Sequence, residues 1–190
     1  MSPTTEFESY LANLILVSSP STSFEDVASP QTSALKWLAD ETFARSAQLT
    51  EEQLLQRFAI ATFWYSVGGP TSLVATTYGW LEPTSECNWK SPGNEFSDSI
   101  VCDENQTIIA ISMEKAGLSG SLPAEVGLLS QVQRLEVLQS GLVSTLPTEI
   151  GLCLSLVSIL LPSTLITGTL PTELGRLTLM ESFSVTGGMN

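Results

Sequence analysis

The chain has 190 residues, a length that suits one or two domains, and 43% of them are hydrophobic. Its 20 acidic and 7 basic residues give a formal net charge of −13, which argues against nucleic acid as a partner because proteins that bind it carry a basic surface. The chain has no histidine. The usual base for a serine or cysteine nucleophile and the common zinc-site patterns are therefore absent, and we expect no enzyme, cofactor or metal site.

The first segment with a regular pattern is a predicted helix over residues 7–15. Its apolar face consists of Phe7, Tyr10, Leu11, Leu14 and Ile15, which recur at helical spacing. The apolar stretch Tyr10–Val17 is short, lacks a basic leader and is interrupted by Asn13, so it is typical neither of a signal peptide nor of a membrane span. We expect no direct membrane insertion by the chain.

Two further helices are predicted from their start signals. Ser29 and Pro30 suit the cap and first turn of one helix. Thr50 and Gln53 form a capping box for another helix, which stops at Gly68-Gly69-Pro70. Residues 1–104, with 14 acidic and 4 basic residues, are therefore expected to form a helical cap that covers the apolar end of the repeats in residues 105–190.

A hexapeptide pattern, Leu-Pro-x-Glu-x-Gly, recurs every 24 residues in that second region. Its copies are Leu122–Gly127, Leu146–Gly151 and Leu170–Gly175. Four apolar columns share the period: Ile111, Leu135 and Ile159; Met113, Val137 and Leu161; Leu118, Leu142 and Ile166; Leu129, Cys153 and Leu177. The first two columns lie two residues apart, which is strand spacing, so the pattern predicts an α/β solenoid with one short parallel strand per coil.

The repeated hexapeptide itself predicts a short helical turn. Proline suits its first position, glutamate favours the positive end of the turn, and glycine lets the chain leave with a positive φ. The three glutamates, Glu125, Glu149 and Glu173, could form a cation site or a column of solvated charges. The second interpretation is favoured, because like charges at coil spacing repel only weakly in water.

The residues from Ile111 to Pro123 resemble the plant-type leucine-rich repeat, LxLxxNxLxGxLP, over about three coils. The asparagine of that motif is replaced by Ala116, Ser140 and Thr164; serine and threonine can bond nearby backbone in part, whereas alanine cannot. The cap resembles those of leucine-rich-repeat proteins abundant in diatoms, in the runs Ser29-Pro30-Gln31, residues 34–39, residues 56–59 and Glu86-Cys87-Asn88-Trp89.

This resemblance implies a right-handed curved solenoid with short parallel strands on its concave face. It also implies a non-catalytic module that recognises a protein or peptide, as the N-terminal part of a receptor-like protein outside the cell. A secreted inhibitor of cell-wall-degrading enzymes, similar to polygalacturonase inhibitors, and a structural or adhesive wall protein remain alternatives. Leu177, Met180, Phe183 and Val185 begin a fourth coil, so we expect the chain to be the front end of a longer array.

In the cap of this family, a Cys-x-Trp and a later cysteine bracket a loop before the first strand. Cys87, Trp89 and Cys102 match that arrangement, so we hypothesise a disulfide between Cys87 and Cys102; two reduced buried thiols are the alternative. Cys153 falls in an apolar column instead. Asn105-Gln106-Thr107 is an N-glycosylation acceptor sequence, which together with a disulfide favours the secretory route.

The candidate ligand-binding residues lie between the inward-facing columns and are expected on the concave face. The main candidates are Glu114, Lys115, Arg134, Glu136, Leu138, Gln139, Ser158 and Leu160; Ala110, Ser112, Pro162 and Ser163 share this face. The mixture of charges with leucine suits a modest protein contact, although tolerated surface residues would look the same.

Overall fold

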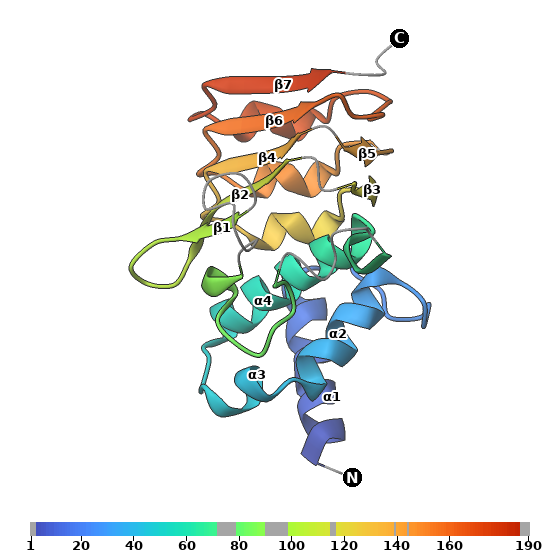
Figure 1. Ribbon diagram of the computed structural model, residues 1–190, viewed down its shortest axis with the longest axis vertical. Coiled ribbons are helices and arrows are strands. Elements are labelled where there is room, and N and C mark those ends of the chain that lie inside the picture. The colour runs from blue at the N-terminus through green and yellow to red at the C-terminus, as the bar shows by residue number, and fades with distance from the viewer. Residues whose placement is uncertain are drawn as a thin grey trace.

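The computed structural model describes residues 3–71, 79–89, 99–114, 117–138, 140–143 and 145–186. Strands are stacked one above another in one half of the molecule, with short helical turns behind them, and longer helices form the other half (Figure 1). The amino-terminal end lies among these helices, whereas the last strand, β7, lies at the opposite end (Figure 1).

The helical half contains α1 (Pro3–Ser18), α2 (Pro30–Asp40), α3 (Thr42–Ser46) and α4 (Glu51–Ser66). The predicted starts are confirmed: Ser29 accepts a hydrogen bond from the backbone N–H of Thr32, and Thr50 and Gln53 form a reciprocal capping box. Leu11 and Ile15 of α1 are buried as expected. Tyr10 stacks on Phe7 of the same helix, but it is 44% exposed and donates to Glu51, so it is not part of the buried core.

The other half is organised around a five-stranded sheet with the order β1-β2-β4-β6-β7. Its strands are β1 (Ser99–Cys102), β2 (Ile108–Glu114), β4 (Arg134–Leu138), β6 (Ser158–Pro162) and β7 (Ser182–Thr186). β1 pairs antiparallel with β2, and the others pair in parallel. Ile111 pairs with Leu135 and Leu135 with Ile159, which confirms the predicted register. β3 (Ser119–Gly120) and β5 (Gly141–Leu142) form a second, two-stranded parallel sheet.

The repeated hexapeptides form three 3₁₀ helices, η3 (Ala124–Leu128), η4 (Thr148–Leu152) and η5 (Thr172–Arg176). Each proline is the cap residue before the turn, so its predicted place at the first helical position is off by one residue. The predicted role of the glycines is wrong: Gly127, Gly151 and Gly175 lie inside the turns and have no positive φ. A Cβ on Gly127 would lie 2.7 Å from the carbonyl oxygen of Glu149. Glycine is therefore needed because successive coils approach closely.

One hydrophobic core runs from the helices through the repeats. It contains Ala59, Phe63 and Trp64 of α4 together with the predicted apolar columns, whose members are at most 5% exposed in all described coils. A second cluster around Leu11, Leu38 and Phe58 joins the cap helices to one another. Phe58 and Phe63 both lie on α4, which therefore contributes to both clusters.

The end of α4 is joined to the first coil by backbone hydrogen bonds. The carbonyl of Val67 accepts from Ser119 at 3.0 Å, and the carbonyl of Ser66 accepts from Ser121 at 3.1 Å. Carbonyls at the end of a helix have no partner within it, so β3 and the residue that follows it supply the missing donors. Gly120 has φ +114°, and a Cβ there would overlap the Ser66 carbonyl oxygen. This contact fixes the cap against the first coil.

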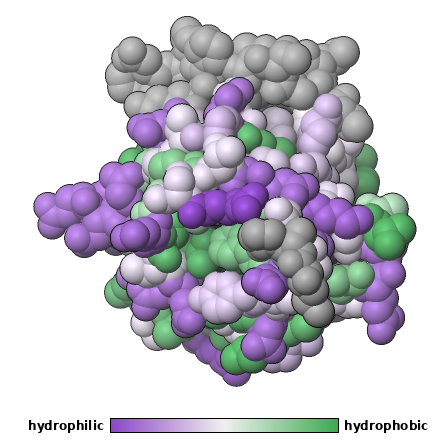
Figure 2. Space-filling model, turned by 90° about the horizontal axis from the view of Figure 1, so that it is seen from below, coloured by the Kyte–Doolittle hydropathy of each residue, from purple (hydrophilic) through white to green (hydrophobic). Residues whose placement is uncertain are grey.

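Seen from the cap end, the surface mixes hydrophilic and apolar residues (Figure 2). A hydrophilic lobe projects on the side where Figure 1 places the β1–β2 hairpin. Within the described ranges, none of the helices combines the length and apolar character that crossing a bilayer requires.

Candidate ligand-binding surface

The outward face of the sheet is built by rows of residues that alternate with the buried columns. The β-sheet register aligns Ala110, Arg134, Ser158 and Ser182 in one row, and Ser112, Glu136, Leu160 and Ser184 in the next. Alternation along a strand places these side chains on the face opposite to Ile111, Leu135 and Ile159, which are fully buried. The sequence-predicted candidates among these residues therefore lie on the face of the sheet opposite to the buried columns.

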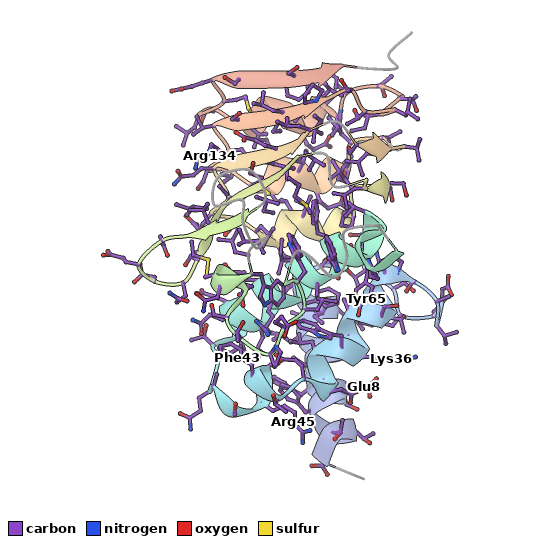
Figure 3. The ribbon with its side chains drawn as sticks, in the orientation of Figure 1. Glu8, Lys36, Phe43, Arg45, Tyr65 and Arg134 are labelled. Carbon is purple, nitrogen blue, oxygen red and sulfur yellow. A yellow bond between two sulfur atoms is a disulfide. The ribbon has the colours of Figure 1, made fainter. Side chains whose placement is uncertain are left out.

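The predicted contact residues differ in their access to solvent. Arg134 is exposed, and Glu136, Leu138 and Leu160 are half-buried. Figure 3 shows Arg134 at the edge of the sheet where the parallel strands begin. Ser158 is only 8% exposed and Ala110 only 2%, so these two positions on the expected face offer little surface to a ligand. Lys115 and Gln139 lie outside the described residues; Glu114 ends β2, but its side chain is not among those described.

The exposed part of this face has mixed chemistry. Arg134 and Glu136 carry opposite charges, while Leu138 and Leu160 add apolar area. Glu136 accepts a long contact of 3.5 Å from the Ser112 hydroxyl, which is at the limit of a hydrogen bond. The face can therefore offer both ionic and apolar contacts.

The structure contains a buried ionic cluster that the sequence did not lead us to expect. Arg57 has no exposed side-chain surface; its Nε donates to Glu41 at 2.8 Å and its Nη1 to Glu86 at 2.7 Å. The guanidinium carbon lies 5.0 Å from the Trp37 ring centroid, with the Phe43 and Trp89 rings at 4.8 and 5.1 Å. Full burial of a charge requires such pairing. The available signal was one arginine inside a mostly apolar stretch of helix, residues 54–64.

The predicted disulfide lies directly beside this cluster. Cys87 and Cys102 are bonded, with their Cα atoms 5.6 Å apart (Figure 3). Cys87 belongs to η2 (Glu86–Asn88), and Cys102 ends β1. The bond therefore ties the segment that supplies Glu86 to the edge of the sheet.

Cys153 is a free and buried thiol, as its apolar column predicts. Its Sγ donates to the Val126 carbonyl at 3.3 Å. Burial raises its pKa to about 12, so the thiol stays protonated at neutral pH and is unsuited to act as a nucleophile.

The glutamate column departs from the expected row of solvated charges. Glu125 is only 1% exposed and accepts from the Thr22 hydroxyl at 2.7 Å and the Gln31 amide at 3.1 Å. Glu149 and Glu173 are half-buried. In the first coil the glutamate thus binds the cap. No group of three or more acidic, cysteine or histidine residues that could hold a metal occurs among the described side chains.

The residues that replace the motif asparagine also have different environments in different coils. Ser140 is buried, and its hydroxyl finds no partner among the described residues, contrary to the expectation that serine bonds nearby backbone. Thr164 is buried and donates to the Leu161 carbonyl at 2.9 Å. Ala116 lies outside the described residues.

Asn105 lies in the turn of the β1–β2 hairpin and is exposed. The Asp103 carboxylate accepts from the backbone N–H groups of Asn105 and Thr107, both at 2.9 Å. The acceptor sequence is thus on an ordered, accessible turn, and its glycosylation stays a prediction.

No protein-family profile matches the sequence, and no curated protein matches it either. Among solved structures, it is similar to a plant ice-binding protein, with 25% identity and a TM-score of 0.57 over 69% of this chain and 40% of that one. The Arabidopsis receptor kinase HAESA, in complex with the peptide hormone IDA and the co-receptor SERK1, gives 17% identity and a TM-score of 0.56 over 74% of this chain and 22% of that one.

The leucine-rich-repeat ectodomain of the receptor kinase SOBIR1 from Arabidopsis thaliana gives 15% identity and a TM-score of 0.49 over 67% of this chain and 64% of that one. The chain spans less than two thirds of each of these three proteins. Together with the 24-residue period, the similarity in fold to the plant ice-binding protein and to HAESA supports a leucine-rich-repeat fold of the plant type.

Proposed function

We propose that this chain is a non-catalytic recognition module, the N-terminal part of a receptor-like leucine-rich-repeat protein. It binds a short peptide, or one segment of a protein, on the outward face of the sheet. The observation that carries the proposal is the combination of Arg134, Glu136, Leu138 and Leu160 on adjacent parallel strands, where charge and apolar area are presented together. Mixed surfaces of this kind are typical of protein contacts.

The size of the sheet favours a peptide over a folded domain. Five strands at a spacing of roughly 4.8 Å span about 19 Å, and a stable protein interface buries about 800 Å² on each partner. An extended peptide needs less area, because its backbone and a few side chains make most of the contacts. HAESA, which shares the fold, is in complex with a peptide hormone and a co-receptor.

An extracellular location fits the same proposal. The Cys87–Cys102 bond is of the kind that persists in oxidising compartments, and Asn105 is accessible there to glycosylation. The resemblance of the cap to leucine-rich-repeat proteins of diatoms forms part of this proposal. That resemblance rests on the cap sequence alone.

A peptide selection tests the function. Random twelve-residue peptides displayed on phage are selected on the immobilised chain, and the recovered peptides are synthesised and titrated by fluorescence anisotropy. We expect binding to weaken at least tenfold in the double variant Glu136→Lys, Leu160→Glu. The first change reverses a charge on the face, and the second places a charge that peptide binding would bury.

Glu8→Lys on α1 is the matched control, because it reverses a charge of the same sign away from the sheet (Figure 3). It should leave the dissociation constant unchanged. Failure to recover any peptide, or equal binding by the double variant, contradicts the proposal.

A further inference from the structure

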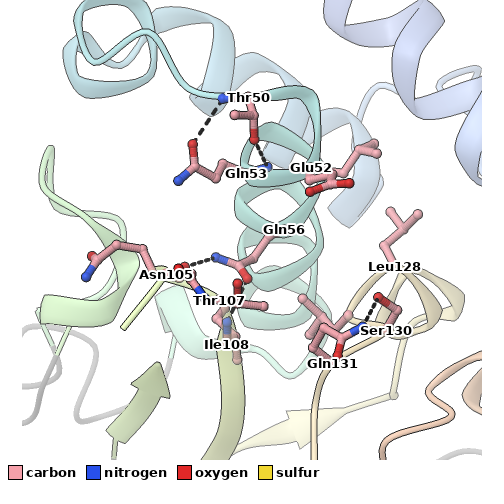
Figure 4. Close-up of a pocket in the computed structure, with 13 residues that line it drawn as sticks. Thr50, Glu52, Gln53, Gln56, Asn105, Thr107, Ile108, Leu128, Ser130 and Gln131 are labelled. Atoms are coloured by element: carbon pink, nitrogen blue, oxygen red, sulfur yellow. Dashed lines mark hydrogen bonds between the residues drawn. The ribbon is translucent and has the colours of Figure 1, made fainter. Parts of the chain in front are cut away.

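A second site lies where the cap meets the first repeat, away from the outward face of the sheet. A cavity of about 470 Å³ opens between three segments that are distant in sequence: the first turns of α4, the turn of the β1–β2 hairpin, and the link from η3 to β4. Figure 4 shows these three walls with Gln56 and Ile108 between them. A cavity of this volume is large enough for part of a peptide.

The base of this junction pocket is held rigidly by one glutamine. The Gln56 amide nitrogen donates to Glu86 at 2.7 Å and to the Gln106 carbonyl at 2.9 Å, and its oxygen accepts from the Ile108 backbone at 2.7 Å. These bonds tie α4 to the hairpin (Figure 4). The pocket is therefore already formed, and binding costs little ordering of the protein.

The rim keeps polar groups available for a ligand. The capping box uses the Gln53 side-chain oxygen, which accepts from Thr50 at 3.0 Å, and no described residue accepts from its NH₂ group. The Gln131 amide makes only 3.5 Å contacts, to Ser130 and from Ser155. Glu52 is exposed, and its carboxylate has no partner in the described ranges. The side-chain amides of Gln53 and Gln131 and the carboxylate of Glu52 are therefore available for contact with a ligand at the rim.

Charge and shape select the class of ligand. Among the described residues, no lysine or arginine lines the pocket, whereas Glu52 does, within a chain of net charge −13; anions are therefore disfavoured and cations favoured. Half-buried Leu55 and Leu128 supply an apolar patch. The described residues that line the pocket include no aromatic ring that could stack on a sugar. Side-chain amides, in contrast, can bond both N–H and C=O groups of a peptide backbone.

We propose that the junction pocket binds a short peptide segment in which a basic side chain pairs with Glu52 and a neighbouring aliphatic side chain covers Leu55 and Leu128. This site is separate from the sheet residues of the proposed function and can exist without them. It enlarges the surface on which the module recognises its partner.

Titration of the ¹⁵N-labelled chain by NMR tests this site with the blocked peptides GLKG and GLEG and with cellotriose. GLKG should shift the amide signals of Gln53, Asn105 and Gln131 in a saturable way, with a dissociation constant on the order of 1 mM for so small a ligand. GLEG should bind more weakly. Glu52→Gln should weaken GLKG binding about threefold, as expected of one exposed ion pair.

Glu8→Gln removes the same charge from α1 and should not change binding. Gln131→Ala, an exposed change that leaves the capping box intact, should also weaken GLKG binding. The proposal is overturned if GLKG causes no saturable shift, if shifts are confined to β4 and β6, if GLEG binds equally well, or if only cellotriose binds. Shifts on β4 and β6 alone would support the proposed function while removing this second site.

Discussion

The repeats and the cap bury their residues by different means. In the repeats, apolar columns and close glycine contacts recur every 24 residues, so each coil is held by the same interactions with its neighbours. The cap depends on single, non-repeated contacts, chief among them Arg57 between Glu41 and Glu86. A periodic interface tolerates the loss of one contact better than a unique one, because the other coils keep theirs.

The largest expected effect is therefore in the cap. Arg57→Met leaves Glu41 and Glu86 buried without their partner, which should lower the free energy of unfolding by about 3–5 kcal/mol. Urea denaturation followed by circular dichroism measures it. Arg45→Met, on the exposed surface of α3, is the control and should change stability by less than about 0.5 kcal/mol. A loss below about 1 kcal/mol for Arg57→Met would show that the cluster is not the main support of the cap.

A smaller effect is expected from the glycines between coils. In Gly151→Ala the new Cβ would lie 2.5 Å from the Glu173 Cβ and 2.7 Å from its carbonyl oxygen, and relief of this overlap should cost about 1–3 kcal/mol. Gly175→Ala is the matched control, because no heavy atom lies within 4 Å of that Cβ. The same denaturation experiment compares them. Equal stability of the two variants would mean that the close coil contact is readily relaxed.

The smallest expected effects on stability concern Ser140 and Thr164, which occupy equivalent positions in neighbouring coils. Thr164→Val removes the hydrogen bond to the Leu161 carbonyl and should cost about 1 kcal/mol. Ser140→Ala removes a buried hydroxyl without a described partner, so stability should stay the same or increase by about 1 kcal/mol. Thermal unfolding monitored by calorimetry resolves the difference. A clear destabilisation by Ser140→Ala would reveal an interaction of that hydroxyl.

The same contrast explains what could be predicted from the sequence. Periodicity predicted the parallel strands of the coils, their register and the buried columns, because each position was repeated in several coils, whereas the antiparallel strand β1 and the small β3–β5 sheet were not predicted. The helix starts at Ser29 and Thr50 were predictable because capping depends on residues three apart. The disulfide was predictable from the family pattern around Trp89.

Contacts between distant segments could not be predicted in this way. Arg57 meets Glu86 across 29 residues, and Glu125 meets Thr22 across 103, with no local pattern to indicate either pair. The burial of Ser158 depends on what surrounds its strand, which alternation alone does not indicate. The junction pocket was missed for the same reason, since its walls come from three separate parts of the chain.

The backbone contact at Gly127 and Gly151 also has a consequence for how the length of such a protein can change during evolution. Because coil meets coil through glycine and the backbone of the next turn, a duplication or deletion of 24 residues leaves the remaining glycine contacts between coils with an equivalent partner. An insertion of any other length in these turns shifts glycine away from that contact and brings a side chain into it. Whole coils are therefore the unit in which this molecule can be lengthened or shortened.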